Sequence, residues 1–171
     1  MIKIVKATVN DCELLSNISA KAFWESHGNS ASKENIETFI TKTYNKEVFI
    51  QELLNEDTIY HIIYYNNQAA GYSKIVLNVP HPKIEQQNST KLDRLYLLKE
   101  YYNLKLGAQL FNFNIELSKT NKNTGIWLAV WIENFRAIEF YKKAGFGIVG
   151  SYNFKISETH SNPNHIMYLK Y

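Results

Sequence analysis

The chain has 171 residues, 45% hydrophobic and 20% charged, and its 19 basic and 16 acidic side chains give a formal net charge of +3 at pH 7. This length and composition are typical of a globular protein, so we expect a single domain over 1–171. The charges form no basic stripe for nucleic acid, and no apolar run is long enough to cross a bilayer. No leader pattern is present, so we expect a cytoplasmic protein with no nucleic-acid or membrane partner.

Hydrophobic patterning in the first half of the chain predicts one strand, three helices and a hairpin. Isoleucines alternate with lysines near the start, as in a half-buried strand, and apolar residues then recur at helical spacing. Two runs rich in β-branched and aromatic residues flank Asn66-Asn67, which predicts a hairpin. The expected elements are a strand over 1–7, helices over about 11–24, 32–43 and 46–55, and strands over 58–65 and 68–79.

The second half alternates apolar runs with helical patterns. Gly145 follows two lysines and is typical of a helix end. The expected elements are a strand near 92–98, a helix to about Lys119, a strand over 125–131, a helix over 134–144 and strands over 147–157 and 165–170. The element order is therefore β-α-α-α-β-β-β-α-β-α-β-β, a mixed α/β (α+β) fold.

A candidate anion-binding turn lies between the strand near 92–98 and the following helix. A helix start has unpaired backbone N–H groups and the positive end of the helix dipole, and both attract phosphate. Gly107 would allow close approach to the backbone, and Lys105 adds a positive charge. The residues alone favour a plain helix whose Gly107 packs against a strand, because one glycine is a weak fingerprint.

Strand, turn, helix, strand and then N-x-x-A-x-x-F-Y-x-K-x-G-F resembles the GNAT superfamily of acetyl-CoA-dependent N-acetyltransferases. Within it, the order and spacing are similar to PaiA-type spermidine/spermine acetyltransferases over 2–170, most strongly over 44–150. The resemblance implies a mostly antiparallel central sheet with splayed middle strands and flanking helices. The motif residues are Asn134, Ala137, Phe140, Tyr141, Lys143, Gly145 and Phe146.

The resemblance also implies how acetyl-CoA is bound. Strand backbone would pair with the pantetheine arm, and helix-start amides would hold the diphosphate. The superfamily turn is usually Gln/Arg-x-x-Gly-x-Gly/Ala, but here Tyr102 and Lys105 replace its first two conserved residues. If Lys105 has to adopt a positive φ, it has a steric cost that glycine would not have. The implied cofactor-binding residues are Leu97, Leu98, Tyr102, Asn103, Leu104, Lys105, Leu106, Gly107, Ala108, Asn134 and Lys143.

Tyr141 matches the superfamily's general acid. Attack of an amine on the thioester expels coenzyme A as a thiolate, which a nearby phenol can protonate. On periodicity alone, Tyr141 fits equally well as a core tyrosine of an amphipathic helix. No metal-ligand spacing of histidines is present, and Cys12 is the only cysteine, so we expect no metal, no disulfide and no acyl-enzyme intermediate.

The acceptor amine must lose a proton before it attacks. Asp93 is the first candidate for the base, with Glu25 and Glu133 as alternatives, and each also fits a solvated surface acid. A polyamine acceptor would need acidic and aromatic walls, for which we predict Trp24, Glu25 and Tyr44 as substrate-binding residues, with Glu37 and Tyr72 as further candidates.

The predicted function is transfer of acetyl from acetyl-CoA to a small primary amine, possibly a polyamine. The alternative is a coenzyme A-binding sensor or regulatory module without catalysis, which the Lys105 departure favours and Tyr141 opposes. A homodimer that pairs the closing strands over 147–170 is a further possibility.

Overall fold

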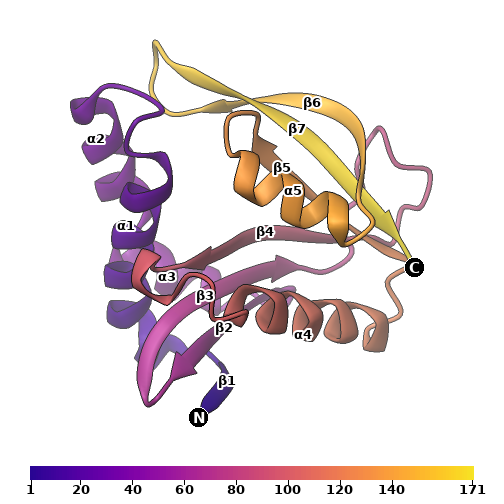
Figure 1. The fold of residues 1–171 in the computed structure, drawn as a ribbon, viewed down its shortest axis with the longest axis horizontal. Helices are drawn as coiled ribbons and strands as arrows, with labels where there is room; N and C mark the ends of the chain where they lie inside the picture. The colour runs from indigo at the N-terminus through magenta and orange to yellow at the C-terminus, as the bar shows by residue number, and fades with distance from the viewer.

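The computed structural model describes all 171 residues and contains one seven-stranded sheet, with strand order β1-β2-β3-β4-β5-β7-β6 (Figure 1). Every neighbouring pair is antiparallel except β4 and β5, which run parallel. This confirms the predicted mixed α/β fold with a mostly antiparallel sheet. The strands are β1 (Ile2–Lys6), β2 (Thr58–Tyr65), β3 (Gln68–Val76), β4 (Thr90–Leu97), β5 (Gly125–Trp131), β6 (Gly147–Lys155) and β7 (Ser161–Lys170).

The helices form two groups on opposite faces of the sheet. In Figure 1, α1, α2 and α3 stand together on the left and α4 and α5 on the right. None of them combines the length and apolar content that a membrane-spanning helix requires. The helices are α1 (Cys12–His27), α2 (Lys33–Thr43), α3 (Lys46–Leu53), α4 (Leu106–Thr120) and α5 (Phe135–Lys143), with 3-10 turns η1 (Val9–Asp11) and η2 (Lys99–Tyr101).

Each face of the sheet has its own hydrophobic core. On the side of α1–α3, Phe23 and Phe49 pack with Tyr60 and Tyr72 of β2 and β3. On the side of α4 and α5, the second cluster joins residues of both helices to β4, β5 and β7; its members include Phe111, Leu92, Ile126, Ile138, Tyr141 and Met167.

The observed elements differ from the predicted ones mainly at strand ends. The strand β3 ends at Val76 rather than near 79, because Asn78 adopts φ of 55° and turns the chain away. The strand β7 begins at Ser161, four residues before the predicted start, despite Pro163. Its missing N–H is tolerated because β5 pairs with β7 only as far as Asn164, and the Pro163 carbonyl accepts a hydrogen bond from Ile132 N at 3.1 Å.

The predicted hairpin is confirmed. Asn66 and Asn67 join β2 to β3 with φ of 48° and 66°, the left-handed pair that a type I′ turn requires and that asparagine tolerates.

The β4–β5 pairing opens the middle of the sheet. Only Thr90↔Ile126 and Lys91↔Trp127 pair, at the start of both strands. Beyond them β4 continues along β3 as far as Leu97, while β5 continues along β7 as far as Trp131. The C-terminal halves of β4 and β5 therefore diverge, as predicted.

A β-bulge interrupts β4 beside this gap. Lys74 of β3 pairs with Arg94, but the next residue, Ile75, pairs with Leu92, so Asp93 is the extra residue. A bulge brings two consecutive side chains to one side of a strand, and bulges are frequent next to active sites. Asp93 and Arg94 consequently both line the cavity described below.

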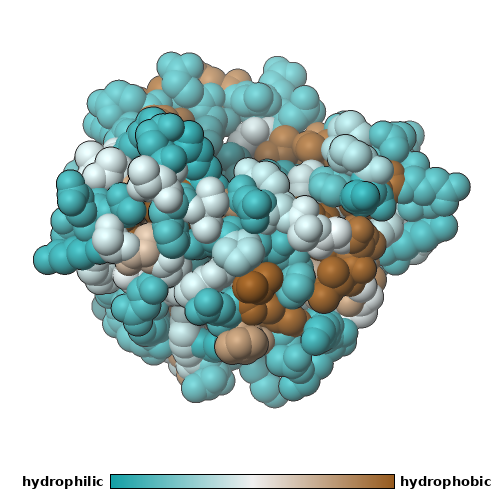
Figure 2. All heavy atoms as spheres, turned by 90° about the horizontal axis from the view of Figure 1, so that it is seen from above, coloured by the Kyte–Doolittle hydropathy of each residue, from teal (hydrophilic) through white to brown (hydrophobic).

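The strand β6 forms one edge of the sheet and has two half-exposed hydrophobic side chains, Ile148 and Tyr152. The face of the molecule in Figure 2 is mostly hydrophilic, with its hydrophobic side chains in small separate groups. Pairing of two copies through the closing strands stays a prediction.

Candidate active site

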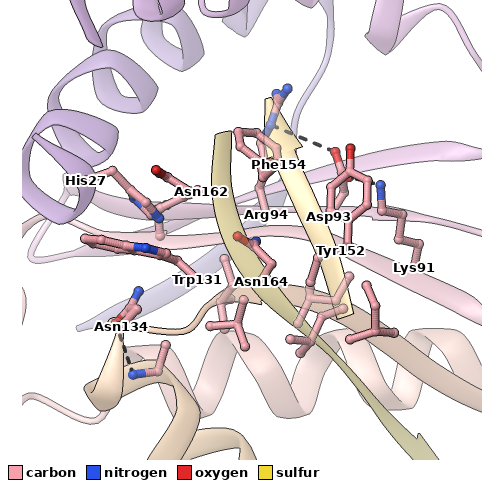
Figure 3. Close-up of a pocket in the computed structure, with 18 of the residues that line it drawn as sticks. His27, Lys91, Asp93, Arg94, Trp131, Asn134, Tyr152, Phe154, Asn162 and Asn164 are labelled. Atoms are coloured by element: carbon pink, nitrogen blue, oxygen red, sulfur yellow. Dashed lines mark hydrogen bonds and ion pairs between the residues drawn. The ribbon is translucent and has the colours of Figure 1, made fainter. Parts of the chain in front are cut away.

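A cavity of about 390 Å³ lies where β4 and β5 diverge. Figure 3 shows side chains of β6 and β7 above it, with His27, Trp131 and Asn134 on one side and Lys91, Asp93 and Arg94 on the other. It joins residues of α1 and α2 and of α5 to the opened sheet. Its lining includes Phe23, His27, Phe39, Tyr44, Lys91, Asp93, Arg94, Tyr96, Trp127, Trp131, Asn134, Tyr141, Tyr152, Phe154, Asn162 and Asn164.

The turn before α4 leaves backbone donors free. As the first three residues of the helix, Leu106, Gly107 and Ala108 have no intrahelical acceptor, and none of the turn or cap hydrogen bonds involves their N–H groups. The first paired amide is that of Gln109, which donates to the Lys105 carbonyl at 3.2 Å. These amides form the kind of helix start that binds phosphate.

Lys105 caps this helix start with left-handed backbone, φ 58° and ψ 13°, and Asn103 before it also has a positive φ of 66°. Lys105 therefore has the positive φ that glycine would adopt without steric cost. A side chain other than glycine costs about 1 kcal/mol there. The Lys105 side chain makes no capping hydrogen bond that would offset this cost.

We expect Lys105→Gly to stabilise the protein by roughly 0.5–1 kcal/mol, less than the full relief because glycine also gains freedom in the unfolded state. Coenzyme A affinity should be preserved or increased, since the amides and not the side chain define the turn. Thermal unfolding and calorimetric titration measure the two effects. Lys105→Ala is the matched control, because it removes the charge and keeps the strain. A tenfold loss of affinity in both variants would show that the charge is required.

A cation that the sequence analysis missed lies beside the turn. The Arg136 guanidinium carbon is 3.5 Å from the centre of the Tyr102 ring, and Arg136 has no hydrogen bond or ion pair within the protein. Its donors are therefore free next to the helix-start amides. Lys143, the predicted phosphate contact, is exposed in the last turn of α5 and does not line the cavity. Lys143 lies about 10 Å further along the helix axis than Arg136, and Arg136 is the cation in contact with Tyr102 of the turn.

The strand backbone near the gap is only partly available. The Leu98 N–H donates to Ala70 O at 3.0 Å, and its carbonyl accepts from Tyr101 N at 2.9 Å. Leu98 is therefore not a free backbone donor, contrary to the prediction. Neighbouring N–H groups of a strand point in opposite directions, so the Leu97 N–H points toward the gap. The Tyr102 N–H is also used internally, since it donates to Lys99 O.

Asn134 lines the cavity and caps α5, as its Oδ1 accepts a hydrogen bond from Ala137 N at 3.2 Å. Its amide nitrogen has no partner in the protein and remains available to a ligand.

Tyr141 reaches the cavity from α5. Its ring is buried at 8% exposure and packs against Phe111, Phe140 and Phe146, with ring centres 6.3, 5.4 and 5.5 Å away. Its hydroxyl has no hydrogen-bond partner, and burial raises the pKa of Tyr141 above its usual value. The side chain is therefore a fixed phenol that stays protonated at neutral pH.

Asp93 lies in the cavity, where it is surrounded by cations. Its carboxylate contacts Lys91 Nζ at 2.6 Å and Lys74 Nζ at 3.0 Å, and Arg94 Nε lies 4.0 Å away. Burial raises the pKa of Asp93, but the charges of Lys91, Lys74 and Arg94 outweigh it and hold this pKa well below its usual range. Asp93 is thus a poor proton acceptor, which argues against the base role predicted for it.

The two alternative bases do not line the cavity. Glu25 accepts a hydrogen bond from Lys99 N at 2.8 Å and so ties α1 to η2, while Glu133 is exposed. Of the predicted substrate-binding residues, Tyr44 lines the cavity and stacks on Arg94, but Trp24 and Glu25 do not line it. Glu37 and Tyr72 also lie outside it.

His27 is a cavity residue that the sequence analysis missed, because the predicted helix stopped near Trp24. Ser26 Oγ donates to Ala22 O at 2.8 Å, so it accepts from His27 Nδ1–H at 2.7 Å, and this tautomer leaves a lone pair on Nε2. Burial lowers the pKa of His27 to about 4, so the ring is neutral at pH 7. Its ring stacks on Phe23 with centres 4.7 Å apart.

The opened sheet, the free helix-start amides and the buried phenol together define the class of protein. The family model described as "Acetyltransferase (GNAT) family" matches residues 23–146. The chain belongs to this family, whose members are N-acetyltransferases with acetyl-CoA as cosubstrate. The predicted family, enzyme class and cofactor are thereby confirmed.

Proteins that are similar to most of this chain are also described as N-acetyltransferases. The chain is 28% identical over 144 residues to an uncharacterized N-acetyltransferase in the pepI 3′ region of Lactobacillus delbrueckii subsp. lactis, covering 84% of this chain and 83% of that protein. It is 27% identical over 154 residues to the spermidine N(1)-acetyltransferase of Thermoplasma acidophilum, covering 86% and 89%. The crystal structure of PaiA N-acetyltransferase from Thermoplasma acidophilum in complex with coenzyme A has a TM-score of 0.81 at 24% identity, covering 100% and 99%.

Proposed function

We propose that this protein transfers the acetyl group of acetyl-CoA directly to a small primary amine, with Tyr141 as general acid. The observation that carries the proposal is the position of the buried Tyr141 phenol, whose hydroxyl has no partner in the protein, on the cavity between the diverging strands. In this arrangement the pantetheine arm lies in the gap, and the amides of Leu106–Ala108 with Arg136 hold the diphosphate.

The transfer follows from the chemistry of the thioester. The amine nitrogen attacks the acetyl carbonyl, a carbon–nitrogen bond forms, and the carbon–sulfur bond breaks. The leaving thiolate takes the phenolic proton of Tyr141. The attacking amine must first lose its proton, and we propose that this proton leaves through water, because the lowered pKa values of both Asp93 and His27 make these side chains weak bases.

The name of the Thermoplasma acidophilum relative, a spermidine N(1)-acetyltransferase, is the support for a polyamine as the acceptor. The cavity contains few of the acidic groups that a polyamine needs, since Asp93 is the only carboxylate in its lining. The acceptor that the cavity supports is therefore a small primary amine.

The test is release of free coenzyme A, detected with a thiol reagent, when the protein is incubated with acetyl-CoA and a panel of small amines. We expect release that depends on both the amine and the protein. Binding of acetyl-CoA with no release from any amine would instead support the coenzyme A-binding sensor or regulatory module. Mass measurement of the acetylated amine confirms the product.

A further inference from the structure

The charged side chains around the acceptor side of the cavity have a positive balance. Lys91, Asp93 and Arg94 are the only charged residues in the lining at pH 7, because burial lowers the pKa of both histidines that line the cavity, His27 and His81. Behind them, Lys74 and Glu52 complete the cluster and cancel each other's charge. Three cations therefore share two carboxylates, and the cluster has a net charge of +1.

Neither carboxylate is free to receive an incoming ammonium group. One Asp93 oxygen contacts Lys91 at 2.6 Å, and the other contacts Lys74 at 3.0 Å. Glu52 contacts Lys74 at 2.9 Å and Arg94 at 3.3 Å, and it also accepts a hydrogen bond from the Tyr60 hydroxyl. A second ammonium group brought by the substrate would have to displace one of these cations.

The cationic side chains, in contrast, have N–H donors that are not used within the protein. Arg94 uses only Nη1 for hydrogen bonds, to Tyr60 Oη at 2.6 Å and to Glu52, and its Nη2 has no hydrogen-bond partner. Lys91 is the most exposed cation of the cluster, with 32% side-chain exposure, and it lies over the Trp127 ring at 5.3 Å. A carboxylate brought by the substrate would find charge-assisted donors there.

We propose that the acceptor is a primary amine that also carries a carboxylate, which Lys91 and Arg94 bind while the amine faces the acetyl group. This inference rests on the proposed acetyl transfer and deepens it. It differs from what the name of the spermidine N(1)-acetyltransferase relative would lead one to expect, since spermidine is a polycation.

Three acceptors that share a primary amine at one end of a four-methylene spacer differ in the charge at the far end, where putrescine has a second primary amine. They are 5-aminopentanoate, pentylamine and putrescine, which end in a carboxylate, a methyl group and an ammonium group. At saturating acetyl-CoA we expect kcat/KM to fall in that order, by about tenfold or more from the first to the second, as for a unit charge beside a partly shielded cation. Equal values, or a preference for putrescine, would overturn the inference.

Lys91→Met tests the cluster itself, because methionine keeps an apolar stem over Trp127 and removes the net positive charge of the cluster. The preference for 5-aminopentanoate over pentylamine should fall at least fivefold, through a loss of kcat/KM for 5-aminopentanoate. Lys3→Met on the exposed strand β1 changes the net charge equally and should alter neither value. An unchanged preference in Lys91→Met would contradict the proposed binding site.

The two proposals fail in different ways. If the amine panel is acetylated but putrescine is the best of the three acceptors, acetyl transfer stands and the carboxylate inference is overturned. If acetyl-CoA binds and no amine of any kind releases coenzyme A, acetyl transfer is overturned and the inference with it.

Discussion

Replacing Tyr141 by phenylalanine is expected to lower kcat about 100-fold or more, the size of effect that a positioned general acid has. The thiolate of coenzyme A would leave without a proton donor, whereas the ring would still pack against Phe111, Phe140 and Phe146. Affinity for acetyl-CoA and thermal stability should therefore change little. Steady-state kinetics on the best acceptor, with calorimetric titration of acetyl-CoA, measure the two effects separately.

Tyr152→Phe is a matched control, since Tyr152 is a half-exposed tyrosine in the lining of the same cavity. It should keep kcat within about threefold, because only a phenol at the leaving sulfur affects this step. Because burial raises the pKa of Tyr141, the wild-type enzyme should not lose this acid between pH 7 and 9. Full kcat in Tyr141→Phe would remove the residue from the mechanism.

Replacing Asp93 by asparagine is expected to destabilise the fold by about 3–5 kcal/mol, since it removes the carboxylate that Lys74 and Lys91 share. The cluster would then hold three cations and only Glu52. Asp93 has only 20% side-chain exposure, so water compensates little of the loss. Urea unfolding at pH 7 measures the effect, and Asp57→Asn, an exposed acid with no ion pair, should change stability by less than about 0.5 kcal/mol.

The Asp93 effect has a defined pH dependence. The folded-state pKa of Asp93 is held below the unfolded value of about 4, so its stabilisation is fully present above pH 4 and is lost as the pH falls through the folded-state pKa. The difference between wild type and Asp93→Asn should therefore shrink between pH 5 and pH 2. Adding Lys74→Met should restore part of the stability of Asp93→Asn by removing one uncompensated cation. A difference that stays constant with pH would contradict the assigned role of the ion pairs.

Local sequence patterns predicted the helices and strands well, because residues within or next to each element determine where it begins and ends. The Asn66-Asn67 turn required left-handed backbone that asparagine tolerates, and Gly145 ends α5 with φ of 99°. The gap between β4 and β5 was expected from the resemblance to the GNAT superfamily, and the structure has it at the expected strands. Tyr141, Asp93, Tyr44 and Asn134 were all predicted at the site, and all of them line the cavity.

The rest of the site depends on relations between distant segments. The bulge at Asp93 is a property of the β3–β4 register, which neither strand encodes alone. For that reason the sequence did not show that Lys74 and Lys91 would occupy the carboxylate of Asp93. The stacking of Arg136 on Tyr102 joins α5 to the turn before α4. In the sequence, the signal for this contact was an arginine two residues after Asn134, in a motif already assigned to cofactor binding. His27 entered the cavity because α1 continues one turn past Trp24.

The short β4–β5 pairing has a mechanical consequence. Apart from the covalent chain, two rungs at Thr90↔Ile126 and Lys91↔Trp127 are the only backbone ladder between a four-stranded half, β1–β4, and a three-stranded half, β5–β7. The two halves are therefore held together mainly by side chains, through the second hydrophobic core that both halves share, rather than by backbone hydrogen bonds. A ligand bound across the opening would contact both halves of the sheet. We therefore expect the sheet to be more rigid when the cavity is occupied than when it is empty.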